Sequence, residues 1–145
     1  MLPSGDDDAL YHVLRSARMV EGTEGAPWRD PNLNFPRGAD VLWPPLFDGV
    51  LASAGWIAAG GTVPDREAIA TGGSFVPPVL GLLSIALVAL LADVLVGAGG
   101  IEAAFVLALL PADATFSMLG RTDHHVLESL LCTVAFLAFA WGLRQ

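Results

Sequence analysis

The 145-residue chain is too apolar and too poor in charge to resemble an ordinary soluble domain. Hydrophobic residues make up 54% of it, charged residues only 15%, and the mean hydropathy is +0.59; soluble domains carry roughly 25% charged residues. The formal net charge of −8 excludes a basic nucleic-acid-binding surface, which needs clustered cations. The single cysteine, Cys132, excludes an intrachain disulfide and a cysteine-based zinc site. These features predict a membrane protein or part of one.

The first half of the chain is polar and predicts a region outside the membrane, residues 1–73. Within it, residues 8–20 predict an amphipathic helix, because apolar side chains recur at helical spacing. These side chains are Leu10, Val13, Leu14, Ala17 and Val20, and the face opposite them holds Asp8, His12, Arg15 and Arg18. Residues 27–45 predict an ordered loop, because five prolines interrupt any period while several large apolar side chains favour burial. Residues 46–59 predict a short helix that lies against the membrane or a partner.

Three apolar segments in the second half, about 75–96, 101–116 and 126–143, predict transmembrane helices. The first holds 22 residues, which at about 1.5 Å each reach roughly 33 Å, enough for a bilayer core of about 30 Å. The middle segment is the least apolar, with Glu102 near its start and Pro111 within it. The fold class is therefore all-α, with integral membrane helices and a polar loop around residues 117–125 between the last two of them.

Two clusters of carboxylates and imidazoles could carry chemistry, SGDDDALYH at 4–12 and GRTDHHVLE at 120–128. Carboxylate oxygen and imidazole nitrogen are ligands for Mn²⁺, Mg²⁺ or Zn²⁺. Two predicted spans separate the clusters and return the chain to the same side, so one cation could bridge them; if the middle segment does not span, the clusters face opposite sides. The alternative is structural: acidic residues at 6–8 and the Asp-His-His stretch could only cap their helices.

At these residues the chain resembles the catalytic subunit of oligosaccharyltransferase, in its single-subunit archaeal and bacterial form. Asp8 lies four residues before the His of a Tyr-His pair, Tyr11-His12. The segment DPNLNFPRGADVLWPPLFD at 30–48 is similar to the family's first external loop. The pattern Gly120-x-x-Asp123-x-His125 is similar to the acidic motif of its second external loop. Two hydrophobic segments lie between the loops, as the family's membrane order requires.

The resemblance implies roles for individual residues. Asp8 is expected to be a catalytic carboxylate that also binds a divalent metal, although Asp6 or Asp7 could take its place. Asp123 and His125 are expected to be metal ligands for Mn²⁺ or Mg²⁺. Arg121 and His124 are further candidates for substrate binding.

The implied reaction is transfer of a lipid-linked oligosaccharide, carried on polyprenyl phosphate or diphosphate, to asparagine in Asn-x-Ser/Thr sequons of an acceptor polypeptide. The resemblance places the chain in a prokaryotic cell membrane, with residues 1–73 and the 117–125 loop on the external side. Because the family's later spans and its carboxy-terminal domain have no counterpart here, we expect a fragment that is inactive alone. Two alternatives stay open: another glycosyltransferase that uses polyprenyl-phosphate sugars, and a small structural or accessory membrane protein without catalysis.

Overall fold

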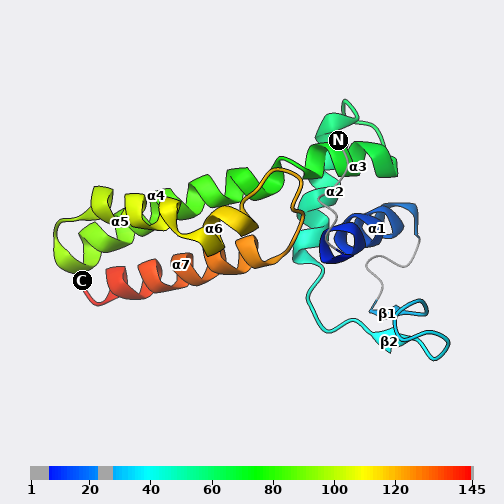
Figure 1. The fold of residues 1–145 in the computed structure, drawn as a ribbon, viewed down its shortest axis with the longest axis horizontal. Helices are drawn as coiled ribbons and strands as arrows, with labels where there is room; N and C mark the ends of the chain where they lie inside the picture. Colours follow the sequence, from blue (N-terminus) through cyan, green and yellow to red (C-terminus); the bar gives the residue numbers. More distant parts are fainter. Residues whose placement is uncertain (1–6, 23–27, 145) are drawn as a thin grey trace.

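The structure, a computed structural model, describes residues 7–22 and 28–144. A long bundle of helices extends from a cluster of shorter helices and a small hairpin (Figure 1). Strand structure in the described residues is limited to that hairpin, so the predicted all-α fold class is confirmed. Asp6, one of the three acids at the start of the chain, lies outside the described residues.

The first helix, α1 (Asp7–Glu21), has two acidic residues in its first turn and Arg18 in its last turn, an arrangement that the helix dipole favours. Its buried face differs from the predicted one. Leu10 is 41% exposed, whereas His12 and Arg15, expected on the opposite face, are 1% and 0% exposed. The reason is a charged partner: Asp48 in the next helix pairs with both side chains, and polar groups enter a core when they are paired there.

A loop and two helices complete the region before the bundle. Strands β1 (Arg29–Asp30) and β2 (Ala39–Asp40) pair antiparallel within the loop. Helix α2 (Leu46–Ala58) follows, and then α3 (Arg66–Gly73). Helix α3 was not foreseen from the sequence; Asp65 caps it by accepting a hydrogen bond from the backbone N–H of Ala68, as N-cap carboxylates do.

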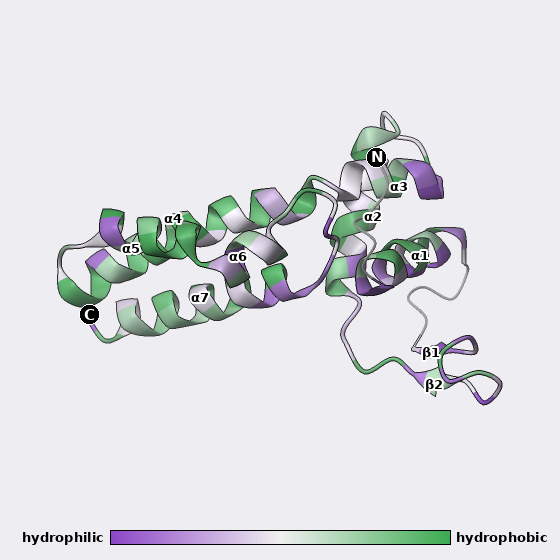
Figure 2. Ribbon diagram, in the orientation of Figure 1, coloured by the Kyte–Doolittle hydropathy of each residue, from purple (hydrophilic) through white to green (hydrophobic). Residues whose placement is uncertain are grey.

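The bundle contains α4 (Val76–Val96), α5 (Gly100–Leu109), α6 (Pro111–Phe116) and α7 (His125–Gly142). Helices α5 and α6 run back along α4, and α7 then follows the direction of α4 (Figure 1). Among the described residues, two helical stretches are long and apolar enough to cross a membrane, Arg66–Val96 and His125–Gly142. Apolar residues dominate the bundle, and polar residues interrupt it at several places, including both of its ends (Figure 2).

The middle apolar segment, expected as one helix over 101–116, is divided into α5 and α6. Leu110 adopts an extended conformation, with ψ 122°, because the residue before a proline avoids helical dihedral angles. Pro111 then occupies the first turn of α6, where its missing N–H costs little. The expectation of a single middle helix is therefore wrong, although both pieces run in the expected direction.

Buried side chains from five helices form a common core at the junction between the bundle and the shorter helices. The members are Val13, Ala17, Phe47, Leu51, Ile69, Ala70, Val76, Leu80, Val126, Leu127 and Leu130. Because α1, α2 and the start of α7 all contribute, this core holds the polar ends of those helices next to one another. The candidate site lies at that meeting point.

Candidate metal centre

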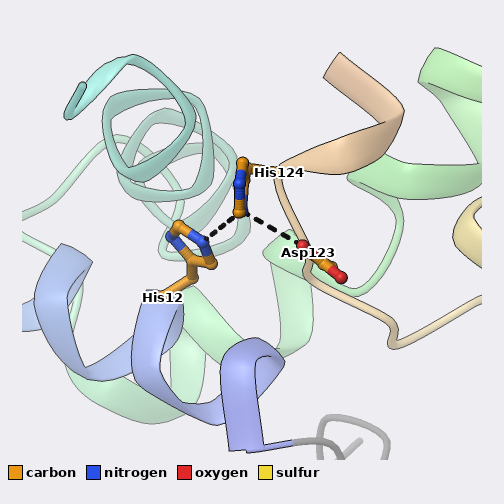
Figure 3. A group of neighbouring side chains, drawn as sticks. All are labelled: His12, Asp123 and His124. Atoms are coloured by element: carbon orange, nitrogen blue, oxygen red, sulfur yellow. Dashed lines mark hydrogen bonds and ion pairs between the residues drawn. The ribbon is translucent and has the colours of Figure 1, made fainter. Parts of the chain in front are cut away.

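Two segments separated by more than a hundred residues bring their histidines together. His12 comes from α1, and Asp123 and His124 come from the loop that precedes α7; the three side chains point toward one another (Figure 3). The two clusters recognised in the sequence therefore meet at one end of the bundle.

Local backbone interactions hold the loop before α7 in place. Gly120 has φ +82°, a left-handed conformation that glycine adopts at low cost, and its N–H donates to the carbonyl of Ser74. Thr122 is fully buried, and its hydroxyl donates to the carbonyl of Ala9 in α1 at 2.8 Å. This bond ties the loop directly to the helix that carries His12.

The ligand atoms of His12, Asp123 and His124 all lie within 4.8 Å of one another. His124 Nδ1 lies 3.0 Å from His12 Nε2 and 3.1 Å from Asp123 Oδ1. Both His12 and Asp123 are buried, at 1% and 3% exposed. Two imidazoles and a carboxylate are ligand types that bind divalent transition metals.

A second group of ligand atoms shares His124 and is more open to solvent. It consists of His124, His125 and Glu128. His125 Nδ1 lies 3.1 Å from a Glu128 carboxylate oxygen, and both side chains are about half exposed, at 45% and 59%. The ring of His124 therefore connects a buried group to an exposed one.

Burial lowers the pKa of His124 below its ordinary value of 6.5, and the neighbouring His12 lowers it further. The negative charges of Glu128 and Asp123 raise this pKa, but the net shift is downward. The neutral imidazole is consequently favoured at neutral pH. A neutral ring is the form that binds a metal ion.

Behind His12 lies a buried ion pair. Asp48, in α2, is 0% exposed and its Oδ2 lies 2.8 Å from Arg15 Nη1. The other oxygen, Oδ1, lies 2.7 Å from His12 Nδ1. The ring of Trp43 lies nearly parallel to that of His124, at 10° with centroids 6.1 Å apart. The ion pair therefore contacts His12, and the ring of Trp43 stacks on His124.

The structure distributes the predicted site residues unevenly. Asp123 and His124 belong to the buried group, and His125 belongs to the exposed one. Asp8 lies exposed on the first turn of α1 and is a member of neither group of described residues. Arg121 places its guanidinium over the ring of Phe116, 5.2 Å from the ring centroid.

Two residues of the site were not among the predicted ligands. His12 was placed on the polar face of its helix and in the first cluster, and Asp48 lies in the segment 46–59, which was predicted only as a short helix; its charge stands inside an otherwise apolar stretch. That charge was the available signal, because an acidic residue in an otherwise apolar helix is rarely buried without a partner. The identity of the partner could not be found from spacing alone, since 36 residues separate His12 from Asp48.

Comparison with known proteins identifies two relatives from Archaeoglobus fulgidus. Dolichyl-phosphooligosaccharide-protein glycotransferase 1 is 33% identical over 126 residues, which is 86% of this chain and 20% of the relative. Glycotransferase 2 is 33% identical over 122 residues, 82% of this chain and 19% of the relative. The resemblance to the oligosaccharyltransferase catalytic subunit is confirmed.

The chain covers only a small part of each relative's length. The chain spans about a fifth of the length of the two oligosaccharyltransferases it matches, 20% and 19%. No protein-family model matches the chain, and no solved structure matches it significantly. The relationship therefore rests on the sequence comparison with these two enzymes.

Proposed function

We propose that this chain forms the cation-binding part of a membrane glycosyltransferase. The enzyme would transfer an oligosaccharide from a polyprenyl-phosphate or polyprenyl-diphosphate carrier to asparagine in Asn-x-Ser/Thr sequons of an acceptor polypeptide. The observation that carries the proposal is the meeting of the two predicted clusters, through His12 and His124 at 3.0 Å, in a chain similar to two dolichyl-phosphooligosaccharide-protein glycotransferases.

The residues present fit a divalent cation. Asp123 and His125 remain the proposed ligands, with His124 between them in the chain. Asp8, one helical turn before His12, would polarise the acceptor amide. The donor set contains imidazole nitrogen, which suits Mn²⁺ better than Mg²⁺, a cation that prefers oxygen ligands and retained water. When bound, the cation would act as a Lewis acid that neutralises charge on the leaving phosphate.

The position of the site supports placing two regions of the chain on the same side of the membrane. The loop before α7 meets α1 and α2 at one end of a bundle whose helices are mostly apolar along their length (Figure 2). In the proposed enzyme, residues 1–73 and the 117–125 loop lie on the external side of a prokaryotic cell membrane, where the acceptor polypeptide and the headgroup of the carrier are available.

A chimera tests the proposed reaction. This chain would replace the aligned 126-residue segment of glycotransferase 1, and the purified chimera would be assayed with Mn²⁺, a lipid-linked oligosaccharide and a sequon peptide. We expect glycopeptide formation by the chimera and none by the isolated chain, which covers about a fifth of such an enzyme.

Two substitutions in the chimera distinguish the effect of the candidate site on the rate from the effect of a change elsewhere in the chain. Asp123→Ala should lower the rate on the order of 100-fold or more, because a lost cation contact removes several kcal/mol of charge stabilisation. Glu102→Gln, an exposed residue of α5, is the control and should leave the rate unchanged. A chimera that transfers glycan equally well with Asp123→Ala would contradict the proposal.

A further inference from the structure

The buried carboxylate of Asp48 has more partners than charge neutralisation requires. Its Oδ2 pairs with Arg15 at 2.8 Å, and both side chains are 0% exposed. The Asp48 backbone carbonyl also accepts a hydrogen bond, at 3.0 Å, from the hydroxyl of Ser16. The other carboxylate oxygen, Oδ1, lies 2.7 Å from Nδ1 of the His12 ring. Burying two charges is costly, and their attraction repays the cost only when the geometry is good and further hydrogen bonds satisfy the remaining polar atoms.

This contact determines which nitrogen of His12 carries the proton. The carboxylate of Asp48, paired with a guanidinium, can only accept, so Nδ1 of His12 is the donor. In the neutral ring Nε2 then keeps its lone pair. A carboxylate that binds one imidazole nitrogen in this way orients the other toward a metal in many metal centres.

Packing holds the ring of His12 in the same orientation. The ring meets Phe47 edge to face, with centroids 5.2 Å apart at 85°, and Trp43 lies 6.2 Å away on another side. With His12 only 1% exposed, the ring has little room to rotate. Its Nε2 consequently stays directed at Nδ1 of His124, which in turn contacts Asp123 (Figure 3).

The atoms that face Nε2 are those of a ligand set. His124 Nδ1 is 3.0 Å from Nε2 and 3.1 Å from Asp123 Oδ1. Ligand atoms that bind one tetrahedral metal ion at about 2.0–2.1 Å are about 3.3 Å apart. Two of the three separations are therefore close to those of a metal site, and all three ligand atoms lie within 4.8 Å of one another.

We infer that His12 is a further ligand of the cation, through Nε2, and that Asp48 and Arg15 are positioning residues that fix its tautomer and ring orientation. The inference rests on the proposed function, because the cation is the one that Asp123 would hold. It adds a ligand from the first external region and a role for the charge within α2. In this arrangement α1, α2 and the loop before α7 must all be in place for full affinity.

The experiment uses the full chain in detergent and two probes, Mn²⁺ for calorimetry and diamagnetic Zn²⁺ for nuclear magnetic resonance. The chain has three histidines, so ¹⁵N-histidine labelling gives a spectrum that single substitutions can assign. We expect the proton of His12 on Nδ1 before metal is added, and a shift of Nε2 to that of a metal-bound nitrogen afterwards.

Calorimetry then tests the positioning residue. Asp48→Asn should weaken Mn²⁺ binding roughly 10- to 100-fold, as losses of outer hydrogen-bond partners do. The control is Asp40→Asn, the same chemical change at a carboxylate that is 74% exposed in β2, which should change the affinity less than twofold. Circular dichroism shows whether Asp48→Asn keeps its helices; if it unfolds, the Zn²⁺ spectrum of the unaltered chain alone decides.

The outcomes separate the inference from the proposed function. If Mn²⁺ binds and Asp123→Ala abolishes binding, while the Nε2 resonance of His12 does not respond to Zn²⁺, the inference is overturned and the proposed function stands. If the unaltered chain binds neither ion, the inference is overturned, and the chimera assay decides the proposed function by itself. A metal-bound shift at His12 Nε2 with weakened binding by folded Asp48→Asn establishes the inference.

Discussion

Helices α2 and α3 approach so closely that one added methyl group should separate them. A Cβ placed on Gly55 would lie 2.7 Å from Ile69 Cγ1 and 2.8 Å from Ile69 Cα, where ordinary contact is 3.4–4 Å. The clash involves backbone, so a rotamer change of Ile69 cannot relieve it. From the facing helix, a Cβ on Gly72 would meet the carbonyl of Ala54. Gly55→Ala is therefore the substitution that tests this interface.

The size of the effect follows from a matched control in the same helix. A Cβ on Gly49 would touch only the flexible end of Met19, at 3.7 Å. Alanine is favoured over glycine in a helix by about 1 kcal/mol, so Gly49→Ala should stabilise the chain by up to that amount. Gly55→Ala gains the same helix propensity but must move Ile69 by about 0.6 Å, and overpacking of this kind costs about 1–3 kcal/mol. The difference between the two variants is then about 1–3 kcal/mol.

The assay is unfolding of both variants and the unaltered chain in mixed detergent micelles, followed by circular dichroism. Gly55→Ala should unfold at a lower fraction of denaturing detergent than the unaltered chain, and Gly49→Ala at an equal or higher one. If Gly55→Ala proved as stable as Gly49→Ala, the close contact between α2 and α3 would be refuted. The Mn²⁺ affinity of Gly55→Ala would also report whether α2 still presents Asp48 correctly.

Three further predictions concern the polar groups around α1. Burial, and after it the charge of Asp30, raises the pKa of Tyr11, the only tyrosine in the chain, from 10.0 to about 12. The folded chain therefore holds the Tyr11 proton more tightly than the unfolded chain, and the stability that this supplies should be lost as the pH rises from 10 through 12. Near-ultraviolet absorbance should show that Asp30→Asn shifts the titration midpoint of Tyr11 back toward 10. Burial raises the pKa of Asp30, but hydrogen bonds from the Asn32 N–H and from Arg18 lower it more, to a net value below 3.8. The stability from Asp30 is therefore present above pH 3.8 and lost as the pH falls below it, and Arg18→Met should flatten the acid-unfolding profile; an unchanged profile would count against this. Thr122→Val removes the hydrogen bond to the Ala9 carbonyl and should lower the free energy of unfolding by about 1 kcal/mol in the same unfolding assay. The control is Thr133→Val, where the hydroxyl donates within its own helix, and it should lower the free energy of unfolding less. Equal losses would argue against the bond between Thr122 and Ala9.

The bundle helices were the most predictable elements because their signals are local. The apolar run before Gly97 predicted a helix over 75–96, and the structure has α4 over Val76–Val96, ended by a left-handed Gly97 with φ +84°. Long apolar runs determine their own conformation through hydrophobicity and few charges. Helix α3 has only eight residues and little apolar periodicity, so its capping aspartate was the only signal, and a lone Asp occurs in many loops.

The site could be predicted only in part because its contacts join distant segments. Residue types and spacing identified Asp123 and its neighbouring histidines as candidate ligands. The orientation of α1 depends on which side chains find partners, and the partner of His12 lies 36 residues away in α2. The apolar periodicity favoured burying Leu10, but the buried network of Arg15, His12 and Asp48 outweighed it. Sequence periodicity treats charged residues as solvent-facing and cannot register such a network.

The two clusters meet although the middle segment is divided into two helices. The condition stated from the sequence was that this segment spans, so that the chain returns to the side where it started, and an unbroken helix was not part of that condition. In the structure α5 and α6 contain ten and six residues, which at about 1.5 Å each give a return path of roughly 24 Å, plus about 3 Å for the extended Leu110. Helix α4 has 21 residues and is about 31 Å long by the same measure. The return is nearly complete, and the remaining distance is covered by the loop over residues 117–124. What brings His124 to His12 is therefore the length of the return path, and it does not depend on whether one helix or two provide it.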